Sequence, residues 1–307
     1  MTHTVFIDGA AGTTGLEIVE RLAQRTEFEL LILDEEARKD TAARRDAYHA
    51  ADFAVLCLPD EAAIEALALA QGARVRIIDA SSAHRVSPGW TYGFPELIGR
   101  NKVAVANRVS NPGCYPTGFL ALLAPLVRRG LLPSHWPYTC HAVSGYSGGG
   151  KALIARFEGD REIAFRDYAM SLGHKHVPEM QKFAGLAHAP LFAPAVIPAH
   201  RGMVVEVPLH LGQMERVAAV DGLRDCLTDF YDGSAVVRVH QETPDEILLR
   251  TSMEPSDRLD LWVYGASDGS QARLVARLDN LGKGASGAAV QSLNLMAGLS
   301  ETAGLNL

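Results

Sequence analysis

Residues 110–118 place a lone thiol, Cys114, between two prolines and two glycines, directly ahead of an apolar stretch with helical periodicity. This pattern predicts that Cys114 lies at the N-terminal end of a helix. The partial positive charge of a helix start favours thiolate over thiol, and a thiolate attacks carbonyl carbon. A buried structural cysteine is also typical of such a segment, because free cysteine is among the most buried residue types. The spacing alone leaves both interpretations open.

Histidines that could exchange a proton with this thiol follow later in the chain. His174 and His176 stand just before a predicted helix, and His200 stands at the entrance of a predicted strand over 204–211. His174 and His176 would face opposite ways in an extended chain and no third ligand is evident nearby, so we expect no metal. One histidine acting as general acid and base is more plausible, because its pKa of about 6.5 suits proton transfer near neutrality.

Anion-binding groups flank these candidates. Arg108 could hold a carboxylate or phosphate with two parallel bonds, or form a surface salt bridge. Arg201 could hold a carboxylate in the same way, or be an ordinary loop residue at the entrance of the strand. Residues 140–151 read as a glycine and serine loop that ends in a lysine and is similar to an anion cradle. It lacks the spacing of the phosphate-binding loop of nucleotide hydrolases.

The first third of the chain reads as a dinucleotide-binding unit. An apolar run at 5–8 leads into a G-x-x-G-x-x-G turn at 9–15 and then into helical periodicity, so strand, glycine turn and helix follow in order. Such a turn lets the backbone approach a pyrophosphate. Further strands alternating with a helix over 61–71 predict a parallel sheet. These strands are expected at 28–33, 51–58, 75–79 and 103–106.

The end of the second predicted strand bears on cofactor choice. Acidic residues there favour NAD, and basic residues accommodate the 2′-phosphate of NADP. The chain offers both, with acidic residues at 34–36 followed by Arg38 and Lys39. Beyond the strand that ends at Asp79, residues 81–85 lie where ligands bind in open α/β sheets.

The last third predicts antiparallel strands at 261–265 and 273–279, a turn of small residues, and a helix over 288–299 that returns to the first domain. With 307 residues, two domains are expected. The net charge of −7 argues against broad nucleic-acid binding. The N-terminus shows no signal peptide or membrane span, and four scattered cysteines fit reduced thiols, so we expect a cytoplasmic protein.

Three segments together carry a family resemblance: residues 110–117, 173–179 and 279–285. Over essentially its full length the chain resembles the shorter type of the N-acetyl-γ-glutamyl-phosphate reductases. These belong to the wider group of aldehyde and acyl-phosphate dehydrogenases that includes the aspartate-semialdehyde dehydrogenases. The resemblance implies NADPH-dependent reduction of N-acetyl-L-glutamyl 5-phosphate to N-acetyl-L-glutamate 5-semialdehyde with phosphate release, in arginine biosynthesis.

The resemblance also implies roles for single residues. Cys114 would be the nucleophile that forms a thioester, and His174 the acid and base, with His176 as the nearer rival and His200 as a third candidate. The acidic run at 34–36 is the feature most at odds with NADP. We expect Arg108, Asn111, Ser144, His176 and Arg201 to contact substrate, and Gly9, Gly12, Thr13, Thr14, Gly15, Arg38, Ser81, Ser82, Asn280, Lys283 and Gly284 to contact NADP.

The expected fold is α/β. Residues 1–113 and 285–307 would form a Rossmann-like dinucleotide-binding domain, and residues 114–284 an α+β catalytic and dimerisation domain with a mixed or antiparallel sheet. The expected partners are a small acyl-phosphate substrate, phosphate and a second copy of the chain, as a homodimer or homotetramer. An enzyme like aspartate-semialdehyde dehydrogenase and a non-catalytic dinucleotide-binding sensor remain alternatives.

Overall fold

Parallel strands organise the first of two units into which the chain divides, Met1–Pro112 with Ala285–Leu305. The computed structural model describes residues 2–215 and 217–307. All neighbouring strands of this six-stranded sheet run parallel, in the order β2-β1-β3-β4-β6-β5. The strands are β1 (His3–Asp8), β2 (Phe28–Leu31), β3 (Phe53–Leu56), β4 (Arg76–Asp79), β5 (Thr91–Tyr92) and β6 (Arg108–Ser110).

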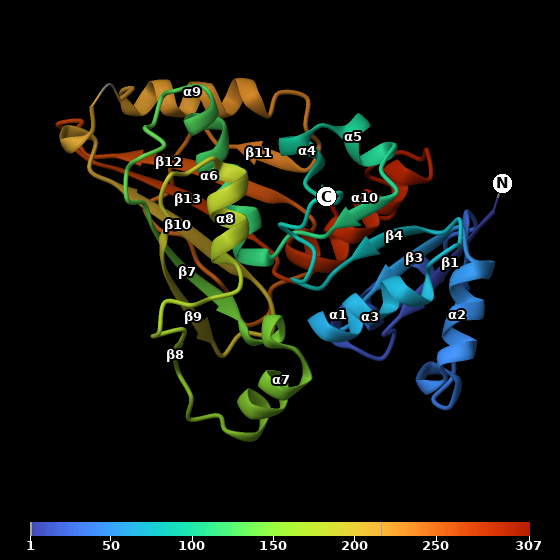
Figure 1. The fold of residues 1–307 in the computed structure, drawn as a ribbon. Coiled ribbons are helices and arrows are strands. Elements are labelled where there is room, and N and C mark those ends of the chain that lie inside the picture. Colours follow the sequence, from blue (N-terminus) through green and yellow to red (C-terminus); the bar gives the residue numbers. More distant parts are fainter. Residues whose placement is uncertain (1, 216) are drawn as a thin grey trace. The chain divides into compact units, whose positions relative to one another are not determined.

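Helices cover both faces of this sheet, because alternate residues of its strands are apolar on each side. Val5 and Ile7 of β1 pack with Val290 of the C-terminal helix on one face. Phe6 between them packs on the other face against Tyr48, with ring centroids 4.9 Å apart. Both layers are visible in Figure 1, and the predicted return of the last helix to the first sheet is confirmed. The helices are α1 (Thr13–Leu22) and α10 (Gly287–Met296) on the first face, and α2 (Thr41–Ala50) and α3 (Asp60–Leu69) on the second.

One strand prediction in this unit is wrong. Residues 103–106 were expected to form a strand, but they lie in and after the short helix α5 (Arg100–Ala104), which follows α4 (Pro95–Ile98). Val103 is fully buried, whereas Val105 is 79% exposed. A short apolar run does not separate a strand from a helix, and the strand here is β6, two residues further on.

The second unit, Gly113–Gly284 with Asn306–Leu307, is built on a mixed sheet. Its seven strands lie in the order β11-β12-β13-β10-β7-β9-β8, and only the β11–β12 and β7–β9 pairs are parallel. The predicted antiparallel hairpin in the last third is β12 and β13. The strands are β7 (Thr139–Gly145), β8 (Arg166–Asp167), β9 (Leu191–Ile197), β10 (Met203–Leu209), β11 (Val237–Val239), β12 (Leu259–Gly265) and β13 (Ala272–Leu278).

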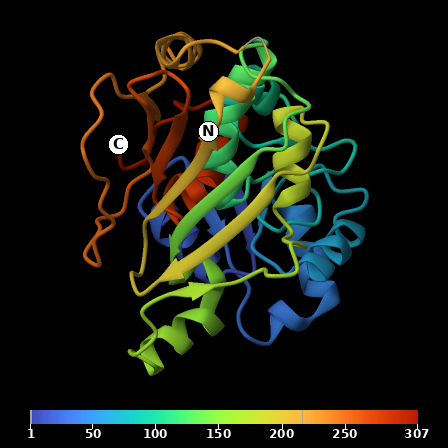
Figure 2. The ribbon, with the colours of Figure 1, turned by 90° about the vertical axis from the view of Figure 1, so that its left-hand side faces the viewer.

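Three helices lie on one face of this second sheet, as the two views of Figures 1 and 2 show. The central one, α6 (Cys114–Arg128), packs on β10 and β13 and is buried all round from Tyr115 to Leu126. A helix with apolar residues on every side belongs in a core, so its start is a fixed point of the unit. The flanking helices are α8 (Val177–Ala184) and α9 (Val220–Phe230).

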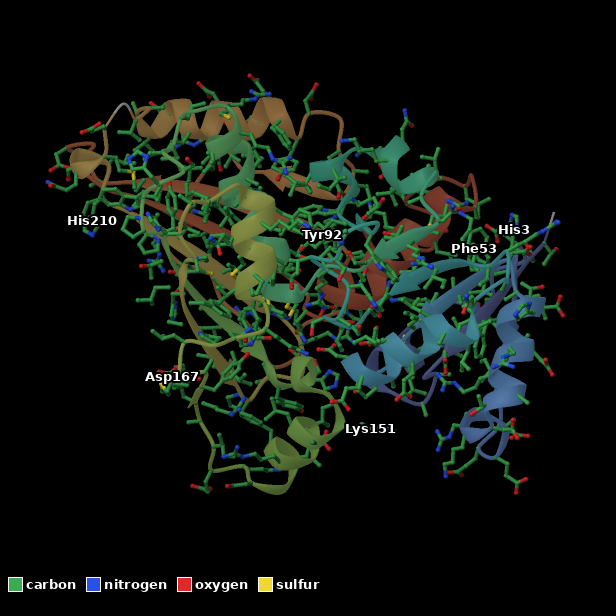
Figure 3. All side chains as sticks on the ribbon, viewed as in Figure 1. His3, Phe53, Tyr92, Lys151, Asp167 and His210 are labelled. Atoms are coloured by element: carbon green, nitrogen blue, oxygen red, sulfur yellow. The ribbon has the colours of Figure 1, made fainter. Side chains whose placement is uncertain are left out.

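The predicted loop over 140–151 is also corrected. Its first half is part of strand β7, in which Cys140 and Ala142 point into the core. Its second half forms a 3-10 turn (Tyr146–Gly149) and the start of α7 (Gly150–Gly159). Lys151 is exposed on α7, and Asp167 lies on the separate edge strand β8 (Figure 3).

Among the described residues, no helix is both long and apolar enough to cross a membrane.

Candidate functional site

Cys114 is the first residue of α6, as predicted for a thiol at a helix start. The N-cap of this helix is Gly113, which has no side chain to bond the first helical N–H groups. The Thr117 hydroxyl donates to the Gly113 carbonyl oxygen over 2.9 Å. The first N–H groups of a helix have no intrahelical acceptor, so they create positive potential at its start. The Cys114 side chain lies in that potential and is partly accessible to solvent.

A carboxylate from another helix reaches the same turn. Glu179, in the first turn of α8, accepts the Gly113 backbone N–H over 3.1 Å. The side chain is 1% exposed. The histidine segment that precedes α8 is therefore tied directly to the turn that carries the thiol.

Aromatic contacts bring both neighbouring histidines to Tyr115, the residue after the thiol. The Tyr115 ring centroid lies 6.1 Å from that of His174 and 5.9 Å from that of His176. The two histidine rings are 4.7 Å apart, and Phe192 of β9 closes the cluster at 5.0 Å from His174. Ring packing thus fixes the positions of His174 and His176 close to the start of α6.

A chain of hydrogen bonds orients His174. The His176 backbone N–H donates to His174 Nδ1 over 3.1 Å, so we assign the ring proton to Nε2. His174 Nε2 lies 3.4 Å from the Tyr168 hydroxyl, which donates to the Tyr115 hydroxyl over 3.4 Å. The Tyr115 hydroxyl donates to the Ala195 carbonyl oxygen over 3.2 Å. Burial raises the pKa of Tyr168 to about 12 and that of Tyr115 well above its usual value, so both stay protonated donors.

His200 lies in a different set of contacts. Its ring packs edge-on against Tyr146 with centroids 5.5 Å apart, and its carbonyl oxygen accepts the Ser147 N–H. The Arg201 guanidinium donates to the fully buried Asp279 carboxylate over 2.8 Å. Asn280 is buried with its amide donating to the Ser147 hydroxyl and accepting the Gly202 N–H, so this amide holds two loops together.

The loop after β13 packs directly on the thiol residue. A Cβ placed on Gly284 would lie 2.9 Å from Cys114 Cβ, which is closer than real Cβ atoms approach, and at a tight 3.0 Å from the Asp279 carbonyl oxygen. Lys283 is buried beside it, in a π-helical turn over Gly282–Ser286. Such turns are frequent at functional sites. Ser144 of β7, another predicted substrate contact, is buried, and its hydroxyl donates to the Gly145 carbonyl oxygen.

The other three cysteines lie in settings that disfavour the thiolate. Burial raises the pKa of Cys57 to about 12, with the negative charges of Asp79 and Asp8 adding to the effect. Burial also raises the pKa of Cys140 and Cys226. We therefore expect these three thiols to react slowly near neutral pH.

The first unit has its own cavity, around the glycine turn. It measures about 310 Å³ and is lined by residues of β1, the turn and the segment after β2. Gly9 has a φ of +91°, and a Cβ on Gly9 or Gly15 would lie 2.4 Å from a carbonyl oxygen. Gly12 is the N-cap of α1, so Thr13 and Thr14 present N–H groups in its first turn. These features fit a pyrophosphate on a helix start.

The acidic run after β2 is used for structure. The Asp34 carboxylate accepts the N–H groups of Glu36 and Ala37, at 3.1 and 2.8 Å. It therefore binds the backbone where the 3-10 turn Ala37–Lys39 starts. Glu35 and Arg38 both line the cavity and pair with each other over 2.9 Å. A cation and a carboxylate from this segment therefore line the cavity in which a ribose or its phosphate would bind.

Ser81 and Ser82 both bind carboxylates of their own unit. The Ser81 hydroxyl donates to Asp79 over 2.8 Å and the Ser82 hydroxyl donates to Asp60 over 2.6 Å. Asp79 also contacts His84 Nδ1 at 2.6 Å. The loop at the carboxyl edge of β4 is thereby held in one conformation.

Arg108 and Asn111 occupy opposite environments in the first unit. Arg108 is exposed, with its guanidinium 5.9 Å from the Trp90 ring centroid. Asn111 is buried, and its amide donates to the Ala285 carbonyl oxygen over 2.9 Å. Its side-chain oxygen has no hydrogen-bond partner in the described residues. An unsatisfied buried acceptor such as this one is available to a donor from a ligand.

Family descriptions match most of the chain. Residues 34–106 match the semialdehyde dehydrogenase NAD binding domain, and residues 114–280 match the semialdehyde dehydrogenase dimerisation domain. A relative from Nostoc, "N-acetyl-gamma-glutamyl-phosphate reductase 2", is 46% identical over 98% of both chains. A relative of the same name from Pseudomonas putida is 48% identical over 97% of both chains. The chain belongs to the N-acetyl-gamma-glutamyl-phosphate reductase family.

Solved structures share the fold at lower identity. Aspartate semialdehyde dehydrogenase II from Vibrio cholerae, complexed with ASA, aligns with a TM-score of 0.72 at 18% identity, over 96% of this chain and 98% of that one. Aspartate semialdehyde dehydrogenase with NADP from Candida albicans aligns with a TM-score of 0.67 at 15% identity, with the same coverage. The predicted α/β class, with one parallel and one mixed sheet, is confirmed.

Sequence reasoning missed two residues that the structure brings to the thiol. Tyr168 contacts both His174 and Tyr115, but nothing in its local sequence marks it. Glu179 belongs to the segment 173–179, in which only the histidines are predicted to act. Its place as the third residue of a helix, where a capping carboxylate is common, was a usable signal. In the described ranges, 2–215 and 217–307, no group of three or more histidines, cysteines and carboxylates could hold a metal ion.

Gly284→Ala should displace Cys114, because the new Cβ would lie 2.9 Å from Cys114 Cβ. A shift of about 1 Å at a reacting group costs about 100-fold in rate, so we expect turnover with N-acetyl-glutamate semialdehyde to fall by about that factor. Gly212→Ala is the matched control, since its nearest contact would be an ordinary 3.7 Å. Steady-state kinetics and circular dichroism check both variants. Equal turnover in the two would contradict the placement of Gly284 against the thiol.

Proposed function

We propose that this chain is an N-acetyl-γ-glutamyl-phosphate reductase. It reduces N-acetyl-L-glutamyl 5-phosphate to N-acetyl-L-glutamate 5-semialdehyde with NADPH and releases phosphate, a reaction of arginine biosynthesis. The observation that carries the proposal is the 46–48% identity over nearly the whole chain to relatives that bear this name. The thiol at the first residue of α6 provides the matching chemistry.

Cys114 acts as the nucleophile. Its thiolate attacks the acyl carbon of the acyl phosphate, the carbon–oxygen bond to phosphate breaks, and phosphate leaves with the electron pair. A thioester on Cys114 remains. The positive potential at the start of α6 stabilises both the thiolate and the oxyanion that forms on the acyl oxygen.

His174 acts as the general acid and base. With the proton assigned to Nε2, held near Tyr168, the ring can donate to an oxygen that gains negative charge and take the proton back afterwards. Bound NADPH supplies the hydride that reduces the thioester carbon. The aldehyde is then released as the Cys114–carbon bond breaks, which restores the thiolate. His176 is the rival for this role because it shares the ring cluster around Tyr115.

The first unit is the dinucleotide-binding domain in this proposal, and the second unit is the catalytic and dimerisation domain. The glycine turn and the start of α1 hold the pyrophosphate, through Gly9, Gly12, Thr13, Thr14 and Gly15. Arg38 holds the 2′-phosphate of NADP. Its pair with Glu35 is solvent-exposed, and exposed pairs contribute little, so the guanidinium can change partner. Ser81, Ser82, Asn280, Lys283 and Gly284 remain proposed cofactor contacts.

Substrate carboxylate and phosphate groups are assigned to arginines. The Arg201 guanidinium donates to the Asp279 carboxylate over 2.8 Å, which orients it. A guanidinium can hold a carboxylate or phosphate with two parallel bonds. Arg108 is exposed, and Asn111 offers its buried side-chain oxygen to a substrate donor. Ser144 and His176 complete the proposed substrate contacts.

We also propose a homodimer or homotetramer in the cytoplasm. The family description of residues 114–280 as a dimerisation domain supports self-association. Four thiols without a disulfide suit a reducing compartment.

Cys114→Ala should abolish the phosphate-dependent oxidation of N-acetyl-glutamate semialdehyde while NADPH still binds, because the thioester cannot form. The test measures NADP reduction and NADPH binding, and runs aspartate semialdehyde in parallel as the substrate of the related dehydrogenases. Cys226→Ala, a thiol on α9, is the control and should stay active. Turnover that persists in Cys114→Ala would sink the mechanism.

His174→Ala should slow the chemical step by about 100-fold to 10,000-fold, as the loss of a general acid and base does. Single-turnover rates of the His174→Ala, His176→Ala and His200→Ala variants, measured side by side, assign the role. A large loss confined to His200→Ala or to His176→Ala would transfer the role to that residue.

Arg38→Ala should raise the KM for NADPH about tenfold or more and leave that for NADH unchanged, because a charged hydrogen bond to phosphate contributes about 1.5–3 kcal/mol. Arg45→Ala, an exposed arginine on α2, is the control. Equal changes for the two cofactors would show that Arg38 does not read the 2′-phosphate.

A further inference from the structure

We propose that Glu179 is a positioning residue for the nucleophile: its carboxylate holds the turn that presents Cys114 and controls how readily the thiol ionises. The inference rests on the proposed role of Cys114. It goes further by assigning a function to a side chain that lies on a different helix and is far from the thiol in sequence.

The start of α6 has no capping side chain of its own. Gly113 at the N-cap has no side chain, and the third helical residue is Pro116. In a capping box that third residue is a Glu or Gln that reaches back to the N-cap N–H. Here the same N–H, that of Gly113, is bonded over 3.1 Å by Glu179 of α8. The carboxylate from α8 therefore replaces the missing half of a capping box.

Two helix starts meet at this carboxylate. Glu179 bonds the N-cap of α6, and it is also the third residue of α8, in the first turn of that helix. Each start carries partial positive charge, which stabilises a negative group there. These contacts explain how a carboxylate that is 1% exposed can be tolerated in the core of the unit.

The charge has a consequence for the thiol. Gly113 and Cys114 are consecutive, so the carboxylate lies one peptide unit from the residue that must become a thiolate. A negative charge at a helix start offsets the potential that favours a second negative charge there. We infer that Glu179 restrains ionisation of Cys114 in the free enzyme while it holds the turn in place.

Several other titratable groups surround the same thiol and must be considered with Glu179. Two tyrosines and two histidines line the ring cluster, and a buried lysine precedes the glycine that packs on Cys114. On the side of the sheet, β10 and β13 present the apolar residues Met203, Val205, Ala276 and Leu278. The titratable groups are Tyr115, Tyr168, His174, His176 and Lys283.

The hydrogen bond between Glu179 and Gly113 also connects the proposed acid and base to the proposed nucleophile. α8 begins directly after the segment that contains His174 and His176, and its first turn supplies Glu179. The hydrogen bond from that turn to Gly113 therefore adds a direct link between the histidine segment and the turn that carries the thiol.

The test compares Glu179→Gln with wild type by the pH dependence of iodoacetamide alkylation at Cys114, followed by mass spectrometry. Glutamine keeps the shape and an oxygen acceptor for Gly113 but removes the charge. We expect the alkylation pKa to fall by about half a unit to one unit, and alkylation at pH 7 to become about three- to tenfold faster. Glu158→Gln, an exposed residue on α7, is the control and should match wild type.

Glu179→Asp provides the second variant, since it keeps the charge but is one methylene shorter. We expect an alkylation pKa close to wild type and a kcat/KM that falls about tenfold, because the turn loses its acceptor. A merely structural Glu179 predicts a lower melting temperature in both variants with no change in either readout. Should Glu179→Gln fail to fold, a wild-type kcat/KM for Glu179→Asp would overturn the inference.

The two proposals fail separately in this experiment. If Cys114 of the wild-type protein is alkylated no faster than Cys57, whose pKa is about 12, the proposed function is wrong. If Cys114 reacts fast but Glu179→Gln has the wild-type alkylation profile, only the role of Glu179 is refuted.

Discussion

The Gly113 N–H bonded to the Glu179 carboxylate is the interaction on which the candidate site depends. α6 is buried on all sides, so its position in the second unit is set by packing. Gly113 and Pro116 leave its first turn without a cap of its own. A carboxylate from α8 supplies that cap, and together with the packing of Gly284 on Cys114 it positions the thiol.

In the first unit, carboxylates likewise bond backbone N–H groups at the starts of helical segments. Asp34 and Asp40 each accept two backbone N–H groups. Asp34 bonds the first residue of the 3-10 turn Ala37–Lys39, and Asp40 is the N-cap of α2. The carboxylates that seemed to oppose NADP are thus partly occupied by the backbone. Of the acidic run and the two cations that follow it, Glu35 and Arg38 line the cavity and pair with each other, and Arg38 is the residue proposed to bind the 2′-phosphate.

Much of the fold follows from local sequence. From the run at 5–8, across the glycine turn, to the helix that follows, the spacing of apolar residues changes from every second residue to every 3.6 residues. This change indicates strand, turn and helix from local sequence alone. The start of α6 at Cys114 follows equally from its prolines and glycines. The strand prediction for residues 103–106 was wrong because an apolar residue type does not show whether a residue is buried. Val103 lies in the core, whereas Val105 is exposed.

The site itself could be predicted only in part. Cys114, His174 and His176 stand out by residue type, and the structure places them around one tyrosine. Tyr168 and Glu179 act through contacts with residues distant in sequence, at separations that no local pattern encodes. The same holds for Arg201 and Asn280, whose side chains are bound by Asp279 and Ser147.

The backbone of Gly284 against the Cys114 β-carbon has a thermodynamic meaning as well as a steric one. A side chain with main chain packed against its β-carbon has less freedom to move, so in the proposed mechanism less of that freedom is lost when the sulfur engages an acyl carbon. Part of the entropy cost of placing the thiol is then met during folding, when the loop after β13 packs on the helix, and not in each catalytic cycle.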